Sequence, residues 1–380
     1  MNSVEFVSAG AGSGKTYRLT QIISEALHNG SARPQGILAT TFTIKAAAEL
    51  RERARSKLLD GGLVDLASAV GQARIGTVNS VCGQLLTRFC FELGMSPDQV
   101  VLDEAQTEEL LRSTLDASLD ENKRILVMEL SKRLAVDDKE WAKPIASIVH
   151  AARENMISPE QLRGMGAINA DLMLKNWPKP QAGVNHTAAL VAALDHVATD
   201  VDKHIRRLEA DGKKVFGNMT DGLEELRQRK RLFQTGAWSW QTWASTATLS
   251  IGAKLAPLVA PVHEAARAHE VHPQFHADVR NYLNLVYGLA ADALAAYAEV
   301  KRAQGVVDFG DQCVLLLEAL TDSQDVRSAL AEELDLVVVD EFQDTNPLQL
   351  AIFVELAKLA KRSVWVGDPK QAIYAFRGTD

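Results

Sequence analysis

The sequence predicts an α/β protein in which a parallel sheet is interrupted by a large helical insertion. Three observations support this prediction: strand and helix patterns alternate over 1–95, helical patterns alone fill 96–289, and the alternation resumes over 290–380. Strands that alternate with helices form parallel βαβ units. We therefore expect one sheet domain built from the first and last ranges, with a helical domain inserted between them.

The first range holds three strand–helix units. Its strands are short apolar or alternating runs, and each is followed by apolar residues at helical spacing. Gly30 ends the first helix, as glycine commonly does. The predicted strands are 4–8, 37–42 and 74–78, and the second and third helices are 45–59 and 81–93.

The middle range lacks strand-like runs and is rich in helical patterns, which cover 108–119, 188–205 and 223–232. Trp238, Trp240 and Trp243 lie close together there. We interpret them as core packing, and a surface that grips duplex DNA or a partner is the alternative. The cations at 227 and 229–231 indicate a solvated helix face, with contacts to DNA phosphates as the alternative.

The last range returns to alternation, with a buried strand over 334–339, a helix over 346–361 that has Pro347 in its first turn, and a strand over 364–366. Asp308 and Phe309 precede this region. We interpret them as capping and packing residues of the helix that re-enters the sheet domain.

Composition limits the class of protein. The 380 residues are 47% apolar and carry a net charge of −8. No window approaches the roughly 18 apolar residues of a membrane span, and no signal peptide is recognisable, so we expect a cytoplasmic protein with no membrane partner. Three cysteines are too few for a disulfide framework or a zinc cluster. The acidic balance disfavours DNA wrapped in positive charge but leaves room for a narrow single-strand groove.

A phosphate-binding loop follows the first strand. Its spacing fits the Walker A pattern, with alanine in place of the first glycine. Backbone N–H groups and the start of the next helix would hold the phosphates of ATP, Lys15 would reach the β- and γ-phosphates, and Thr16 would bind Mg²⁺. The loop consists of Ala9, Gly10, Ala11, Gly12, Ser13, Gly14, Lys15 and Thr16.

Two carboxylates, Asp340 and Glu341, end the buried strand of the last range. The carboxyl ends of parallel strands face the ligand crevice. Asp340 would therefore lie beside Mg²⁺, and Glu341 could accept a proton from the attacking water. Together with the phosphate loop, the pair predicts hydrolysis of the nucleotide rather than binding alone.

These residues and their neighbours resemble the UvrD/RecB family of superfamily 1 DNA helicases. The resemblance covers both α/β ranges, in family order, whereas the helical middle shows no matching motif. The matching segments are 9–16, 40–50, 75–80, 307–311, 340–345 and 367–380.

The resemblance implies a RecA-like P-loop sheet, ATP-driven 3′→5′ translocation on single-stranded DNA or single/double-strand junctions, and a role in repair or recombination. It also implies that Gln371 contacts the γ-phosphate and acts in catalysis. Local packing or satisfaction of a buried backbone group is the alternative for several of these residues. The residues implied to contact DNA are Thr41, Phe42, Thr77, Tyr374, Phe376 and Arg377.

In this family the nucleotide lies between two RecA-like domains, and the sequence ends at Asp380 with no second motor domain. We therefore expect the chain to bind Mg·ATP weakly and to hydrolyse it poorly alone. The early position of the phosphate loop favours the RecB-like branch, and with it a partner in a helicase–nuclease complex. One alternative is a regulatory module that binds nucleotide or DNA without turnover, and another is a different P-loop enzyme such as a kinase.

Overall fold

The computed structural model describes residues 4–8, 14–136 and 140–368. The chain divides into two compact units. The first comprises Met1–Thr114, Val149–Ser158 and Ala295–Asp380, and the second comprises Leu115–Ile148 and Pro159–Leu294. The second unit therefore occupies narrower ranges than the predicted insertion of 96–289, and the predicted domain assignment stays a prediction.

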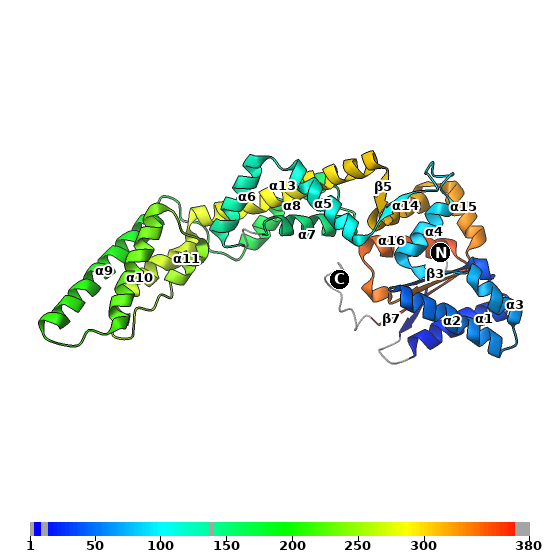
Figure 1. Cartoon of the computed structure of the whole chain (residues 1–380), viewed down its shortest axis with the longest axis horizontal. Helices are drawn as coiled ribbons and strands as arrows, with labels where there is room; N and C mark the ends of the chain where they lie inside the picture. The colour runs from blue at the N-terminus through cyan, green and yellow to red at the C-terminus, as the bar shows by residue number, and fades with distance from the viewer. Residues whose placement is uncertain (1–3, 9–13, 137–139, 369–380) are drawn as a thin grey trace. The chain divides into compact units, whose positions relative to one another are not determined.

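A five-stranded sheet forms the centre of the first unit (Figure 1). Its order is β1-β7-β6-β2-β3, and every neighbouring pair is parallel. This arrangement confirms the predicted α/β class with a parallel sheet. The strands are β1 (Val4–Ser8), β2 (Ile37–Thr41), β3 (Arg74–Thr77), β6 (Leu336–Asp340) and β7 (Arg362–Gly367).

Helices cover both faces of this sheet (Figure 1). Side chains alternate between the faces along each strand. In β2, for example, Ile37 and Ala39 pack into one core cluster and Leu38 into the other. One face carries α1 (Lys15–His28), α2 (Ile44–Asp60) and α3 (Val64–Ala69); the other carries α4 (Val78–Arg88), α14 (Phe309–Asp322), α15 (Gln324–Glu333) and α16 (Pro347–Leu359).

A small second sheet was not expected. β4 (Val100–Leu102) pairs in parallel with β5 (Val306–Asp308). The prediction that strands are absent from 96–289 is therefore wrong for β4. Three residues are too few to show an alternating pattern, and their pairing partner lies some 200 residues further along the chain. The pair places Asp308 at the start of α14.

The second unit is helical throughout its described residues, and none of the helices described in the chain is long and apolar enough to cross a bilayer. Its helices are α6 (Glu121–Leu134), α8 (Pro159–Leu174), α9 (His186–Ala210), α10 (Gly217–Thr235), α11 (Trp240–Thr246) and α12 (Ala260–Arg267), with parts of α5 (Glu104–Ser118), α7 (Ala142–Glu154) and α13 (Pro273–Gln304).

The tryptophan cluster belongs to the core of the second unit. Trp238, Trp240 and Trp243 are all buried, and Trp243 is 0% exposed. The rings of Trp240 and Trp243 lie 5.5 Å apart in a stacked arrangement on α11. Such pairs add to the free energy that area burial supplies. The interpretation as core packing is confirmed.

The basic run on α10 is an ion-paired surface. Arg229 binds Glu225 at 2.6 Å and Lys230 binds Asp195 at 2.6 Å. Arg227 and Arg231 also contact carboxylates, on Asp202 and Glu224. The cations of this run are therefore matched within the unit, in agreement with a solvated helix face.

Candidate active site

The phosphate loop and the acidic pair meet at one edge of the main sheet. β1 and β6 are parallel neighbours of β7, so their carboxyl ends lie at the same edge. Lys15 begins α1 directly after Gly14, whose φ of 80° suits glycine. The Lys15 Nζ atom lies 2.5 Å from Oε2 of Glu341, a residue 326 positions away in the sequence. Two motifs that are distant in sequence therefore form one site.

Asp340 is the buried member of the acidic pair. Its Oδ1 atom has no hydrogen-bond partner among the described residues. Burial and the neighbouring charge of Glu341 raise the pKa of Asp340 to about 6, and Lys15 offsets part of this rise. A buried carboxylate oxygen that lacks a partner fits a divalent cation, because Mg²⁺ prefers oxygen ligands and would stabilise the ionised form.

Glu341 has an unusual backbone conformation for a residue with a side chain. Its φ is 53°, in the left-handed region that costs energy for residues other than glycine. Strained residues of this kind cluster at functional sites. The conformation reverses the chain after β6, and the Glu341 carboxylate then lies against Lys15.

Gln343 ties Glu341 to its surroundings. Its Nε2 atom donates to Glu341 Oε2 at 2.7 Å and to Asp344 Oδ2 at 3.3 Å. Its Oε1 atom accepts from the backbone N–H of Asp368 at 3.1 Å. Gln343 was not among the residues singled out from the sequence, although it lies within the matching segment 340–345. The signal was its position two residues after a carboxylate assigned to catalysis.

Gly367 makes this arrangement possible. A Cβ atom at this position would overlap Gln343 Oε1 and would lie 2.8 Å from the Phe342 ring. Such contacts are far inside van der Waals distance. The carboxyl end of β7 therefore needs glycine so that Gln343 can cross from β6 to the chain that follows β7.

The remaining nucleotide residues are only partly described. Thr16 is partly buried in the first turn of α1, and its carbonyl accepts a hydrogen bond from the Thr20 hydroxyl at 2.7 Å. Its proposed role toward Mg²⁺ stays a prediction. Gln371 and the loop residues 9–13 lie outside the described residues.

The described residues that the resemblance assigns to DNA lie at the carboxyl ends of β2 and β3. Thr41 is buried, and its hydroxyl donates to the Thr43 carbonyl at 3.1 Å. Phe42 is partly buried. Thr77 caps α4 by accepting from the Ser80 N–H at 3.2 Å. These local roles do not test the DNA contacts, which stay predictions, and Tyr374, Phe376 and Arg377 lie outside the described residues.

Asp308 and Phe309 have different outcomes. Asp308 caps α14 in a reciprocal capping box with Asp311, as expected. Phe309 does not pack into the core, because its side chain is 39% exposed. The first residue of a helix has few neighbours on its own helix, and here none of the adjacent elements buries the ring.

Comparison with known proteins gives the family. The model of the UvrD/REP helicase N-terminal domain matches residues 1–380. The chain belongs to this family. It is also similar to proteins whose names describe the first of the subunits of an ATP-dependent helicase/nuclease, with 26% identity to that of Streptococcus suis, 26% to that of Streptococcus sanguinis and 25% to that of Staphylococcus aureus.

These matches cover 98% of this chain but 34% of each relative. The chain thus spans about a third of the length of the relatives it matches. The family assignment agrees with the resemblance found in the sequence motifs.

Proposed function

We propose that this member of the UvrD/REP family is the ATP-binding and single-strand-engaging part of a DNA helicase. The contact between Lys15 and Glu341 carries the proposal, because it joins a phosphate-binding lysine to a carboxylate placed to act on water. In the whole protein, ATP hydrolysis would drive 3′→5′ movement along DNA during repair or recombination. The first unit then corresponds to a RecA-like domain, and the helical unit to an insertion within it.

Each residue of the site has a separate task in this proposal. Lys15 and the loop 9–14 hold the phosphates, while Thr16 and Asp340 hold Mg²⁺. The cation neutralises charge on the β- and γ-phosphates when it is bound. Glu341 orients the attacking water and accepts its proton. Gln371 contacts the γ-phosphate and reports its presence to the DNA.

The Lys15–Glu341 ion pair has a consequence for the order of events. Both side chains are partly shielded from solvent, at 14% and 32% exposure. Phosphate oxygens compete with the Glu341 carboxylate for the ammonium group of Lys15. Nucleotide binding therefore releases Glu341 from the lysine, and Gln343 keeps the released carboxylate in place through its own hydrogen bond.

DNA binding in this proposal depends on stacking rather than on charge. The net charge is −8, and aromatic platforms contribute about 1–3 kcal/mol per stacked base without sequence preference. Phe42, Tyr374 and Phe376 would form these platforms, and Thr41, Thr77 and Arg377 would contact the backbone. The relatives are named as helicase/nuclease subunits, which supports a partner chain for the whole protein.

The test is thermodynamic linkage between the two ligands. Mg·ATP is titrated calorimetrically into the chain with and without a saturating oligo(dT). We expect DNA to raise the ATP affinity, by a factor of about 5–150 if the coupling is of ordinary size. Phe42→Ala should weaken oligo(dT) binding, whereas Phe91→Ala, which removes a ring that is 81% exposed, should not.

Two results would count against the motor proposal in different ways. Equal ATP affinity with and without bound DNA would favour a regulatory module that binds its ligands independently. Failure of the chain to bind oligo(dT) at any concentration would remove the DNA-engaging role altogether.

A further inference from the structure

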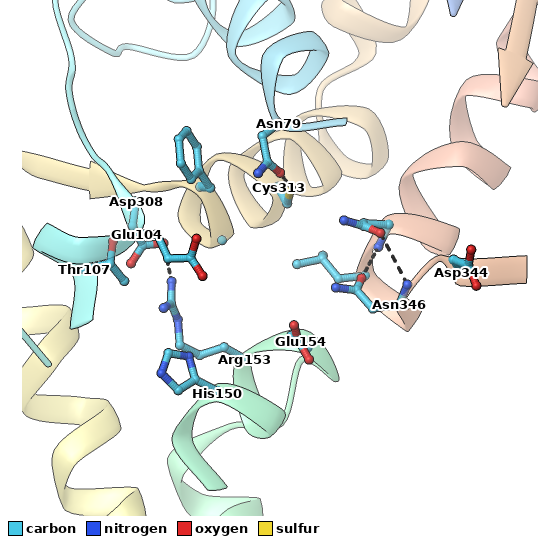
Figure 2. A pocket seen from close by; sticks show the side chains of 14 residues that line it. Asn79, Glu104, Thr107, His150, Arg153, Glu154, Asp308, Cys313, Asp344 and Asn346 are labelled. Atoms are coloured by element: carbon cyan, nitrogen blue, oxygen red, sulfur yellow. Dashed lines mark hydrogen bonds and ion pairs between the residues drawn. The ribbon is translucent and has the colours of Figure 1, made fainter. Parts of the chain in front are cut away.

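A second cavity lies beside the candidate active site, within the first unit. Its volume is about 440 Å³, in the range of small-molecule sites. Asn79, which follows β3, and Asp344, which follows β6, contribute to its wall, so it lies at the carboxyl edge of the sheet. Figure 2 shows Glu104 and Thr107 on one side, His150 and Arg153 below, and Asn346 opposite.

The charges in the wall exclude ions of both signs. Glu104, Glu154, Asp308 and Asp344 are acidic, so a phosphate would meet several like charges. A cation would meet Arg153, whose guanidinium remains partly exposed while it binds Asp308. The occupant that fits best is therefore uncharged.

The rest of the wall offers neutral hydrogen-bonding groups. The side-chain nitrogens of Asn79, Asn346 and Gln349 have no hydrogen-bond partner among the residues that the structure covers, because only their backbone or side-chain oxygen atoms are engaged. Burial and the nearby Arg153 lower the pKa of His150, which keeps its imidazole neutral. Donors and acceptors together suit a ligand with both on one edge.

Phe309 adds an aromatic surface to the wall. Its ring is 39% exposed although it lies in a cavity lined by otherwise polar groups. An aromatic ring beside unpaired amide groups can stack against a flat, polar ring while the amides bind its edge. This combination is typical of sites for nucleobases.

We infer that this cavity accepts one base of the bound single strand and favours bases with an exocyclic amino group. The inference rests on the proposed function, which it extends from tolerance of sequence to a preference. Glu104 has no ion-pair partner among the described residues and accepts from the amino group. Thymine has no such group, so it is the base that fits least well.

Occupancy of the cavity bears on the active site through one side chain. Asp344 lies in the cavity wall, and Gln343 joins Asp344 Oδ2 to Glu341 Oε2 through its Nε2 atom. A base that shifts Asp344 therefore acts on the carboxylate that faces Lys15. The cavity is thus placed to report the identity of a base to the ATPase site.

Oligo(dC) and oligo(dT) of equal length test the inference, because the two bases have the same ring size and differ in the amino group. Fluorescence anisotropy measures their binding to the chain. We expect wild type to bind oligo(dC) about 5- to 100-fold more tightly, the range for one good base-edge contact. Glu104→Gln should remove this preference and leave oligo(dT) binding unchanged.

Phe309→Ala should weaken oligo(dC) binding by about 5- to 100-fold, and Phe309→Tyr should restore it. Glu108→Gln, on the same helix but outside the cavity wall, and Phe91→Ala are the matched controls and should keep the preference.

The possible failures are distinguishable. If wild type binds both oligonucleotides with equal affinity, or if Glu104→Gln keeps the preference, the cavity is not a base site and the proposed function still stands. If wild type binds neither, the proposed function fails together with the inference.

Discussion

Replacing Glu341 with glutamine is expected to slow ATP hydrolysis by the whole protein about 10²- to 10⁴-fold, the usual contribution of a general base. Glutamine keeps the size of the side chain but cannot accept a proton. The same change removes the ion pair with Lys15. Because Lys15 then has no competing carboxylate at Glu341, we expect the affinity of the chain for Mg·ATP to rise.

The two effects have opposite signs, which separates them from general damage to the site. Steady-state hydrolysis and calorimetric titration of Mg·ATP measure them. Glu318→Gln is a suitable control, because Glu318 is an exposed residue of α14 away from the site. Loss of ATP binding in the Glu341→Gln protein would contradict the assigned role, since a residue that competes with phosphate should not be needed to bind it.

Replacing Asp308 with alanine is expected to lower the free energy of unfolding of the first unit by about 3–5 kcal/mol, the cost of breaking a buried ion pair. The Asp308 side chain is 2% exposed. It binds the guanidinium of Arg153, the Lys301 Nζ atom at 2.9 Å and the Tyr297 hydroxyl at 2.8 Å. Alanine would leave both cations buried beside Asp311 alone.

The same carboxylate predicts a dependence on pH. Burial alone would raise the pKa of Asp308, but Arg153 and Lys301 outweigh it and lower the pKa below its ordinary value of 3.8. A lowered carboxyl pKa stabilises the fold at pH values above that ordinary value. This contribution is lost as the pH falls below 3.8, so the wild type should lose more stability there than Asp308→Ala does.

Hydrogen exchange at increasing urea concentrations, followed on peptides from β5 and α14, measures this stability. Asp171→Ala is the matched control, because Asp171 pairs with Arg280 on the surface, where both side chains are about half exposed or more. Exposed pairs contribute about 0–1 kcal/mol. If Asp308→Ala costs no more than Asp171→Ala, the cluster does not hold the unit together.

The sequence predicted those parts of the fold that short-range patterns specify. β2 is a continuous buried run between two helices, and its strand assignment follows from its five residues alone. Asp308 and Asp311 have the spacing of a capping box, which indicated the start of α14. The phosphate loop and the acidic pair were recognisable because each follows a strand and carries a fixed set of residue types.

Long-range contacts were beyond such patterns. β4 is recognisable only through its pairing with β5. Arg153 is one of many charged helix residues until Asp308 is known to lie beside it, 155 positions later. Thr77 caps α4 and starts it at Val78 rather than at the predicted residue 81, because the cap satisfies N–H groups that the apolar spacing does not reveal.

The central claim is that Lys15 and Asp340 bind one magnesium-bound triphosphate. Calorimetric titration of ATP into the chain, with Mg²⁺ or with EDTA, tests it on the wild type and on Asp340→Asn. The wild type should bind ATP more tightly with Mg²⁺, and Asp340→Asn should lose this difference while it keeps the metal-independent binding that Lys15 supplies. An undiminished effect of Mg²⁺ in Asp340→Asn would contradict the claim.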